Sequence, residues 1–178
     1  ITYVKVASGD YKFILAKSLV SKVLGDEVEI LETYKGTDLE YMEYEQLIPE
    51  LKVDKKAFFV TCDEYVTAED GTGIVHIAPT FGADDAFVAK KAGVPGLTMT
   101  TAKGETRPMV DMTGKFFLLE DLDADFVKAN VNVDLYKEYA GRYVKNAYDK
   151  NLTDKDETLD IALCMMLKQQ GLAFRIEK

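Results

Sequence analysis

The chain is organised around one stretch, residues 71–85, which reads GTGIVHIAPTFGADD. It contains the only histidine of the sequence, His76, which follows a Gly-Thr-Gly turn, and it ends in two adjacent acids, Asp84 and Asp85. The apolar residues around His76 predict a short buried strand over 74–77, which Pro79 ends. We expect any chemistry of this chain to lie in this stretch, and the remainder to be the scaffold that presents it.

On either side of this stretch, short segments of alternating hydrophobicity predict a sheet of short strands with helices at its edge. The expected strands cover 3–7 and 11–16 as a hairpin, then 28–34, 39–49, 57–62, 65–67, 97–100, 116–118 and 174–176. The expected helices cover 19–24 after a Ser18 cap, a segment from Asp84 or Asp85 to Gly93, 123–128, 135–147 and 158–170. We therefore predict an α+β fold with a β-barrel-like body and peripheral helices, in a single domain over residues 1–178.

Composition narrows the class of protein. The 178 residues are 47% hydrophobic and 30% charged, which is typical of a globular domain. A formal net charge of −9 argues against a chain that grips nucleic acid by itself, although it allows a local site for one nucleotide end. No apolar run approaches the ~20 residues that span a bilayer, so no membrane partner is expected. Cys62 and Cys164 are expected to be reduced thiols in a cytoplasmic protein.

Each residue of the central stretch has an ordinary explanation and a functional one. Gly71 and Gly73 fit a tight turn between strands, or a backbone that a ligand approaches closely. His76 fits a hydrogen-bonded core residue, a steric wall, a donor or a general base. Asp84 and Asp85 fit a helix cap and a solvated acid, or a partner for a substrate ammonium group. With two cysteines and one histidine, we expect no metal site. The residues alone predict a small-molecule or chain-end site over 67–85.

A family resemblance covers residues 70–85, DGTGIVHIAPTFGADD. This stretch closely resembles the editing domain of isoleucyl-tRNA synthetase, and the histidine before X-Ala-Pro distinguishes it from the related valyl and leucyl enzymes. Weaker resemblance extends to 35–40, 139–147 and 167–178. The resemblance implies the editing-domain fold of class I synthetases, a β-barrel-like body surrounded by helices.

The implied function is hydrolysis of the ester in Val-tRNA(Ile), with hydrolysis of the valyl-adenylate left open. Isoleucine and valine differ by one methylene, worth only ~1–3 kcal/mol in a pocket, so a second site must remove the error. The resemblance assigns His76 to the wall that excludes isoleucine and Asp85 to the α-ammonium of the amino acid, with water as the nucleophile. The residues expected to line the pocket are Thr67, Gly71, Thr72, Gly73 and Asp84.

The resemblance also implies partners. These are the 3′ end of aminoacylated tRNA(Ile) and the synthetic core of the same enzyme chain. No cofactor is expected in this domain, since ATP and Mg²⁺ belong to the synthetic site. We expect the chain to be a piece of a larger synthetase. A threonine-rich strand followed by Pro-Trp-Thr-Leu-Pro is expected before Ile1, and a His-Ser-Tyr-Pro-His segment after Lys178. Two alternatives remain: a valyl-type editing domain, which a lysine in place of His76 would favour, and a non-catalytic interaction module.

Overall fold

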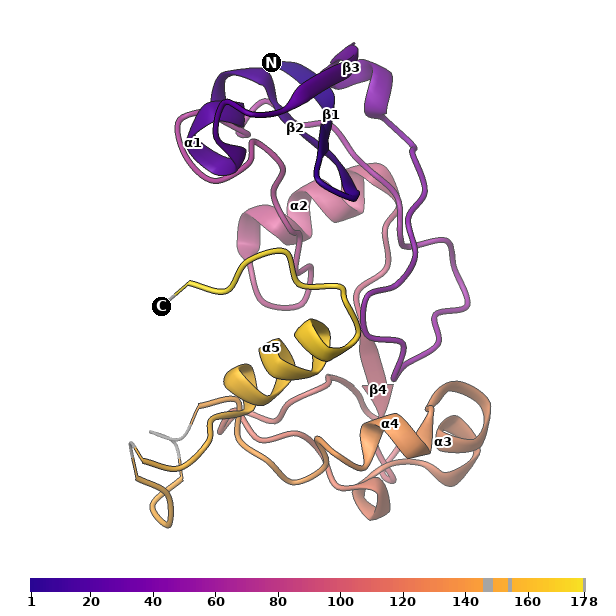
Figure 1. Ribbon diagram of the computed structural model, residues 1–178. Helices are drawn as coiled ribbons and strands as arrows, with labels where there is room; N and C mark the ends of the chain where they lie inside the picture. Colours follow the sequence, from indigo (N-terminus) through magenta and orange to yellow (C-terminus); the bar gives the residue numbers. More distant parts are fainter. Residues whose placement is uncertain (146–148, 154, 178) are drawn as a thin grey trace. The chain divides into compact units, whose positions relative to one another are not determined.

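The computed structural model describes residues 1–145, 149–153 and 155–177 (Figure 1). It divides into two compact units: unit 1 comprises 1–47 and 55–96, and unit 2 comprises 48–54 and 97–178. The predicted α+β class is confirmed, because both units combine helices with small antiparallel sheets. Within the described residues no sheet closes into a barrel. The editing-domain fold and the single domain over 1–178 stay predictions.

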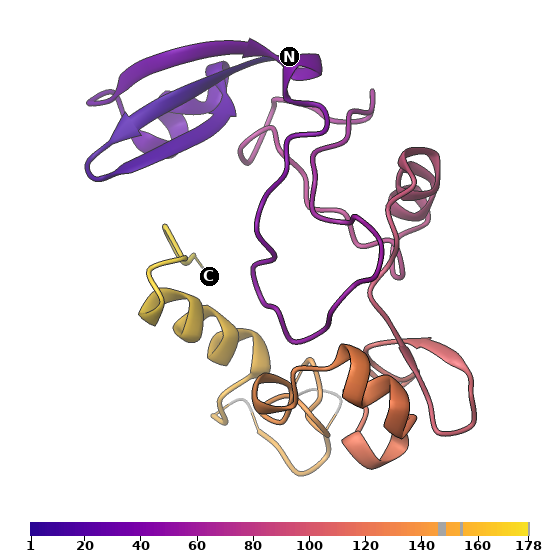
Figure 2. The ribbon, with the colours of Figure 1, turned by 90° about the vertical axis from the view of Figure 1, so that its right-hand side faces the viewer.

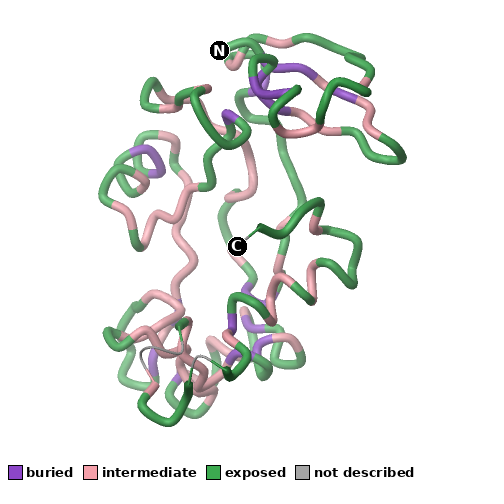
Figure 3. The backbone as a smooth tube through the Cα atoms, turned by 60° about the vertical axis from the view of Figure 1, so that its left-hand side comes forward, coloured by how far each residue is buried: buried purple, intermediate pink, exposed green. Residues whose placement is uncertain are grey.

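Unit 1 is built on a three-stranded antiparallel sheet in the order β2-β1-β3 (Figure 2). Its strands are β1 (Thr2–Ser8), β2 (Tyr11–Ala16) and β3 (Glu29–Lys35). The predicted hairpin is confirmed, and its register places Tyr3 opposite Ala16. Alternation along β1 buries Val4 and Val6 in one cluster and Tyr3 in another, so side chains pack on both faces of this central strand. Figure 3 colours the buried residues of the chain purple.

The helical segments of unit 1 are η1 (Lys17–Leu19), α1 (Val20–Leu24), η2 (Gly36–Leu39) and α2 (Ala83–Ala92). The predicted Ser18 cap is wrong, because Ser18 lies inside η1 and Leu19 is the N-cap of α1. The N-cap of α2 is Gly82, so neither Asp84 nor Asp85 occupies the predicted capping position. The predicted end of α2 is confirmed, since Gly93 adopts the left-handed conformation with φ 73°.

The predicted strands over 39–49, 57–62, 65–67 and 74–77 are wrong in the part of the chain that the structure describes. Residues 41–44 and 58–60 do run antiparallel, through Tyr41 N to Val60 O and Tyr44 N to Phe58 O at 2.8 and 3.0 Å. However, they form only one isolated bridge, Glu43 to Phe59. Tyr41 has φ 66°, and Val60 bonds both to Tyr41 N and to the carbonyl of Met42, so two residues oppose one here and the regular ladder is disrupted.

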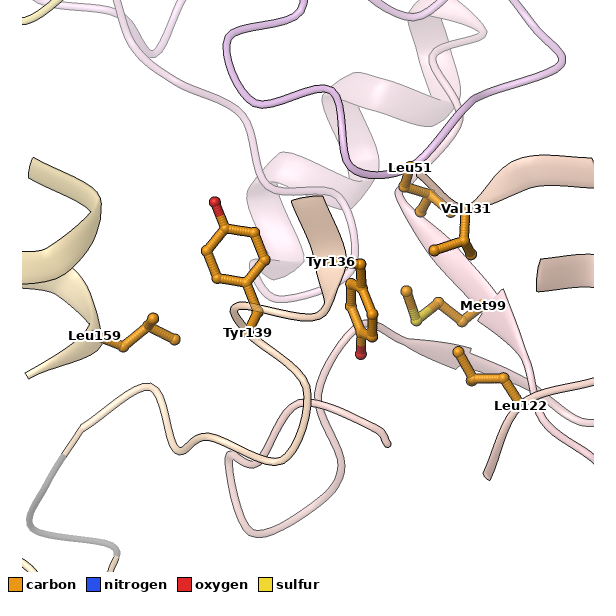
Figure 4. Close-up of a cluster of buried hydrophobic side chains, with 7 residues drawn as sticks. All are labelled: Leu51, Met99, Leu122, Val131, Tyr136, Tyr139 and Leu159. Atoms are coloured by element: carbon orange, nitrogen blue, oxygen red, sulfur yellow. The ribbon is translucent and has the colours of Figure 1, made fainter. Parts of the chain in front are cut away.

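Unit 2 contains the two-stranded sheet of β4 (Thr98–Thr100) and β5 (Thr106–Pro108). Its helical segments are η3 (Leu119–Asp121), α3 (Ala124–Asn130), α4 (Val133–Tyr136) and α5 (Leu159–Gln169). The core of this unit gathers seven buried side chains (Figure 4): Leu51, Met99, Leu122, Val131, Tyr136, Tyr139 and Leu159.

Sequence predictions for unit 2 had mixed outcomes. The strand at 97–100 and the helices at 123–128 and 158–170 are confirmed, and Asp123 and Thr158 are side-chain caps of α3 and α5. The helix over 135–147 is wrong: α4 ends at Tyr136, and Gly141 has φ 74°. Ala147, part of that prediction, lies outside the described residues. Residues 116–118 and 174–176 lack the predicted strands. Among the described helices, none is both long and apolar enough to cross a membrane.

Candidate functional site

All the predicted site residues lie in unit 1. Those from Thr67 to His76 lie on the irregular backbone that leads into α2, and Asp84 and Asp85 lie in the first turn of that helix. The glycine turn at its start is fastened to the β1–β2 hairpin by two hydrogen bonds. Ala16 N donates to the carbonyl of Thr72 at 2.9 Å, and Tyr3 Oη donates to the carbonyl of Gly73 at 2.6 Å. Because two successive carbonyls are bound, the turn has a fixed position on the sheet.

The two glycines of this turn meet different requirements. Both have a positive φ, 64° at Gly71 and 74° at Gly73, which a glycine adopts without strain. A Cβ added to Gly73 would lie 2.6 Å from the Cβ of Ala16, whereas one added to Gly71 would meet no described atom within 4 Å. Gly73 therefore allows the loop to approach the hairpin closely, while Gly71 serves the turn conformation alone.

The other polar residues of the turn make local interactions. Thr72 Oγ1 accepts from Ile74 N at 3.3 Å, so this side chain closes the turn. Asp70 pairs with Lys22 at 2.7 Å, and that hydrogen bond holds the pKa of the exposed carboxyl below its usual range. Thr67 is exposed. Beside it, Ala68 contributes to an open hollow of about 540 Å³, which Ile1, Thr2, Lys17 and Ser18 also line.

His76 is exposed, as are Ile74 and Val75, which are 50% and 47% accessible. The prediction of a buried strand here is wrong, and so is the interpretation of His76 as a core histidine. The physical reason lies in the hydrogen bonds at the two ends of the segment. Ile74 N donates to Thr72 Oγ1, and Ala78 N donates to Asp85 Oδ2. Side chains bind these two donors, so neither donor pairs with a neighbouring strand. Between them Val75 and His76 are exposed and Ile77 is half-buried.

Asp85 ties the far end of this segment to the first turn of α2. Its Oδ2 accepts from Ala78 N at 2.9 Å, and the carbonyl of Ala78 accepts from Phe81 N at 3.0 Å and Gly82 N at 3.2 Å. A Cβ on Gly82 would lie 2.9 Å from Asp85 Oδ2, so glycine leaves room for this carboxylate. Asp85 is half-buried and Asp84 is exposed. The two acids therefore differ in environment, and it is the carboxylate of Asp85 that shapes the loop.

Further acidic and aromatic groups surround Asp85. Burial raises the pKa of the Tyr65 hydroxyl, and the negative charges of Asp85, Asp63 and Asp84 raise it further. Asp63 also pairs with Lys91 of α2 at 3.7 Å. This concentration of carboxylates favours a cationic group over an anionic one. Over residues 1–145, 149–153 and 155–177, no three His, Cys, Asp or Glu side chains form a cluster that could hold a metal ion.

Sequence reasoning missed four of these contributors: Tyr3, Ala16, Asp63 and Tyr65. Asp63 and Tyr65 precede the central stretch by only a few residues, and their polar side chains were the available signal. Tyr3 and Ala16 lie about seventy and sixty residues upstream of the turn that they hold. Their alternation in a hairpin predicted burial, but it carried no information about which loop they contact.

Comparison with known proteins identifies the family. No protein-family model matches the chain. It is 64% identical over 150 residues to an isoleucine–tRNA ligase of Bacteroides fragilis, and 57% identical over 150 residues to that of Porphyromonas gingivalis; each match covers 84% of this chain and 13% of the relative. The isoleucine–tRNA ligase of Cytophaga hutchinsonii is 39% identical over 183 residues, covering 93% of this chain and 16% of the relative. The chain therefore belongs to the isoleucine–tRNA ligase family and spans about a seventh of the length of these relatives.

Proposed function

We propose that the chain is the editing domain of an isoleucine–tRNA ligase, which hydrolyses the ester of Val-tRNA(Ile) after the amino acid has been transferred. The observation that carries the proposal is the Asp85 carboxylate, which is held at the start of α2 by its bond to Ala78, close in the chain to the exposed residues 74–76. The names of the relatives support isoleucine over a valyl-type editing domain.

Asp85 is suited to bind the α-ammonium of the misattached valine. A carboxylate has about four lone-pair positions. The bond from Ala78 N uses one position on Oδ2 and leaves acceptor capacity for a cation. Hydrogen bonds between an ammonium and a carboxylate are among the strong ones in proteins. The neighbouring carboxylates that act on Tyr65 add to the negative potential at this point.

His76 is suited to exclude isoleucine by size. Its side chain is exposed, and the segment that carries it is fastened at both ends. A wall must hold its position to discriminate one methylene, and the two attachments provide that restraint. Thr67, Gly71, Thr72, Gly73 and Asp84 are proposed to line the same pocket, and water is the proposed nucleophile.

The proposal also defines partners. The net charge of −9 provides little attraction for a polyanion, so binding of the 3′ end of tRNA(Ile) depends on basic surfaces of the ligase's synthetic core. The reaction proposed here uses no cofactor in this domain; ATP and Mg²⁺ act at the synthetic site. The proposed location is the cytoplasm.

Deacylation of Val-tRNA(Ile) by the full-length ligase that carries this sequence tests the proposal. Asp85→Ala is expected to lower the rate at least ~10-fold, because a charged hydrogen bond is lost. The adjacent, exposed Asp84 provides the matched control, and Asp84→Ala is expected to change the rate less than Asp85→Ala. Undiminished activity in Asp85→Ala would contradict the proposed role, and an unmodified ligase that leaves Val-tRNA(Ile) intact would favour a non-catalytic module.

A further inference from the structure

Tyr3 lies at the centre of the contacts that hold the glycine turn. It is 7% exposed and faces Ala16 across the β1–β2 ladder. Its ring lies between two glycines: a Cβ added to Gly36 would be 3.2 Å from Tyr3 Cε2, and one added to Gly73 would be 3.5 Å from Cε1. The start of η2 at Gly36 therefore packs tightly against this ring, and the turn at Gly73 lies at ordinary contact distance from its other edge.

The Tyr3 hydroxyl keeps its proton and can therefore donate a hydrogen bond at neutral pH. Burial raises its pKa, and the nearby Cys62 raises it further, so the hydroxyl stays protonated at neutral pH. It donates to the carbonyl of Gly73 at 2.6 Å, in a buried position. Ala16 N makes the parallel bond to the carbonyl of Thr72. Tyr3 and Ala16, which face each other in the hairpin, thus bind the successive carbonyls of Thr72 and Gly73.

We propose that Tyr3 is a positioning residue of the editing site, whose hydroxyl fixes the backbone from which His76 is displayed. The Tyr3–Gly73 bond holds the segment three residues before His76, and the Asp85–Ala78 bond holds it two residues after. The inference rests on the proposed function, since it concerns the precision with which the same site separates valine from isoleucine.

Loss of the hydroxyl is expected to change specificity more than turnover. His76 is proposed to act by its position, whereas Asp85 holds the substrate ammonium through its own attachment to Ala78. Without the Tyr3 hydroxyl, only the Ala16 N to Thr72 bond holds the turn, so the wall gains freedom, while the Asp85 carboxylate keeps its bond to Ala78. Small displacements at a site can cost up to ~100-fold in rate, and size discrimination is especially sensitive to them.

The test compares Tyr3→Phe with Tyr136→Phe in the full-length ligase. Tyr136 is a matched control: it is fully buried, and its hydroxyl donates to the carbonyl of Phe117 at 2.5 Å, but it lies in unit 2. Each variant keeps the ring and loses one hydroxyl-to-carbonyl bond. Retained hydrogen-exchange protection of the β1–β2 amides and of α5 in the same preparations verifies that this domain is folded in both variants.

Two readouts are measured. The first is the ratio of kcat/KM for Val-tRNA(Ile) to that for Ile-tRNA(Ile), which Tyr3→Phe is expected to lower by roughly 10-fold. The second is amide hydrogen exchange over residues 74–77, which Tyr3→Phe is expected to accelerate. Tyr136→Phe is expected to leave both unchanged.

The outcomes separate the two proposals. An active Tyr3→Phe ligase with an unchanged ratio and unchanged exchange overturns the positioning role and leaves the editing function standing. Equal changes in Tyr3→Phe and Tyr136→Phe also overturn it, because they would show a general loss of stability. An unmodified ligase without Val-tRNA(Ile) deacylation overturns the editing function itself, and the inference with it.

Discussion

Gly73→Ala is expected to destabilise unit 1 by about 2–5 kcal/mol. The first contribution is the backbone, because an L-residue at φ 74° costs ~1–2 kcal/mol. The second is overpacking: the added Cβ would lie 2.6 Å from the Cβ of Ala16, and neither atom can rotate away, which costs ~1–3 kcal/mol. Gly71→Ala is the matched control, since its φ is 64° but the added Cβ meets no described atom within 4 Å. Gly71→Ala is expected to lower the free energy of unfolding by only ~1–2 kcal/mol.

Urea denaturation of the 178-residue chain measures both variants, with the free energies of unfolding compared at matched m-values. The two variants share the cost of a positive φ, so the difference between their losses of unfolding free energy gives the cost of the contact with Ala16. Equal losses in Gly73→Ala and Gly71→Ala would refute the close approach of the turn to the hairpin, and with it the fixed position of the site loop.

Two further predictions concern a buried acid and the proposed wall. Glu50 is 8% exposed, its Oε2 has no hydrogen-bond partner in the described structure, and burial raises its pKa above the ordinary 4.5. The folded state therefore holds this proton to a higher pH than the unfolded state, so stability should fall as pH rises from about 4.5 through the folded pKa. Glu50→Gln should lack this fall when unfolding free energies are measured from about pH 4 to 8, and parallel profiles would contradict the prediction. His76→Ala should lower the Val-to-Ile ratio of ester hydrolysis by ~10-fold or more in the full-length ligase, and an unaltered ratio would remove His76 from the wall.

The elements that were predicted correctly are those whose start, end or turn is determined by residues within the element itself. The β1–β2 hairpin alternates in hydrophobicity about a turn at Gly9, and α5 begins at the Thr158 cap and ends before Gly171. The end of α2 at Gly93 follows from the same rule, since glycine takes the left-handed conformation readily. Residues close in sequence determine these features.

The predicted strands at 57–62 and 74–77 failed because a strand requires a partner, and composition does not specify one. At 74–77 the end donors go to Thr72 and Asp85. Near 57–62 the positive φ of Tyr41 interrupts the pairing. In the candidate site, the pattern of residues 70–85 indicated the location, while the attachment to Tyr3 and Ala16 depends on contacts across about sixty to seventy residues of sequence.

In the proposed site the negative charge of Asp85 holds the substrate ammonium, in addition to the structural bond that its carboxylate makes to Ala78. Asp85→Asn separates the two roles, because the amide oxygen can still accept from Ala78 N while the charge is lost. The most direct measurement is the rate of Val-tRNA(Ile) deacylation by the full-length ligase, compared between the unmodified enzyme, Asp85→Asn and Asp85→Ala. Asp85→Asn is expected to lose activity as fully as Asp85→Ala. Activity near the unmodified rate in Asp85→Asn would contradict this expectation, since it would show that Asp85 acts only by shaping the loop.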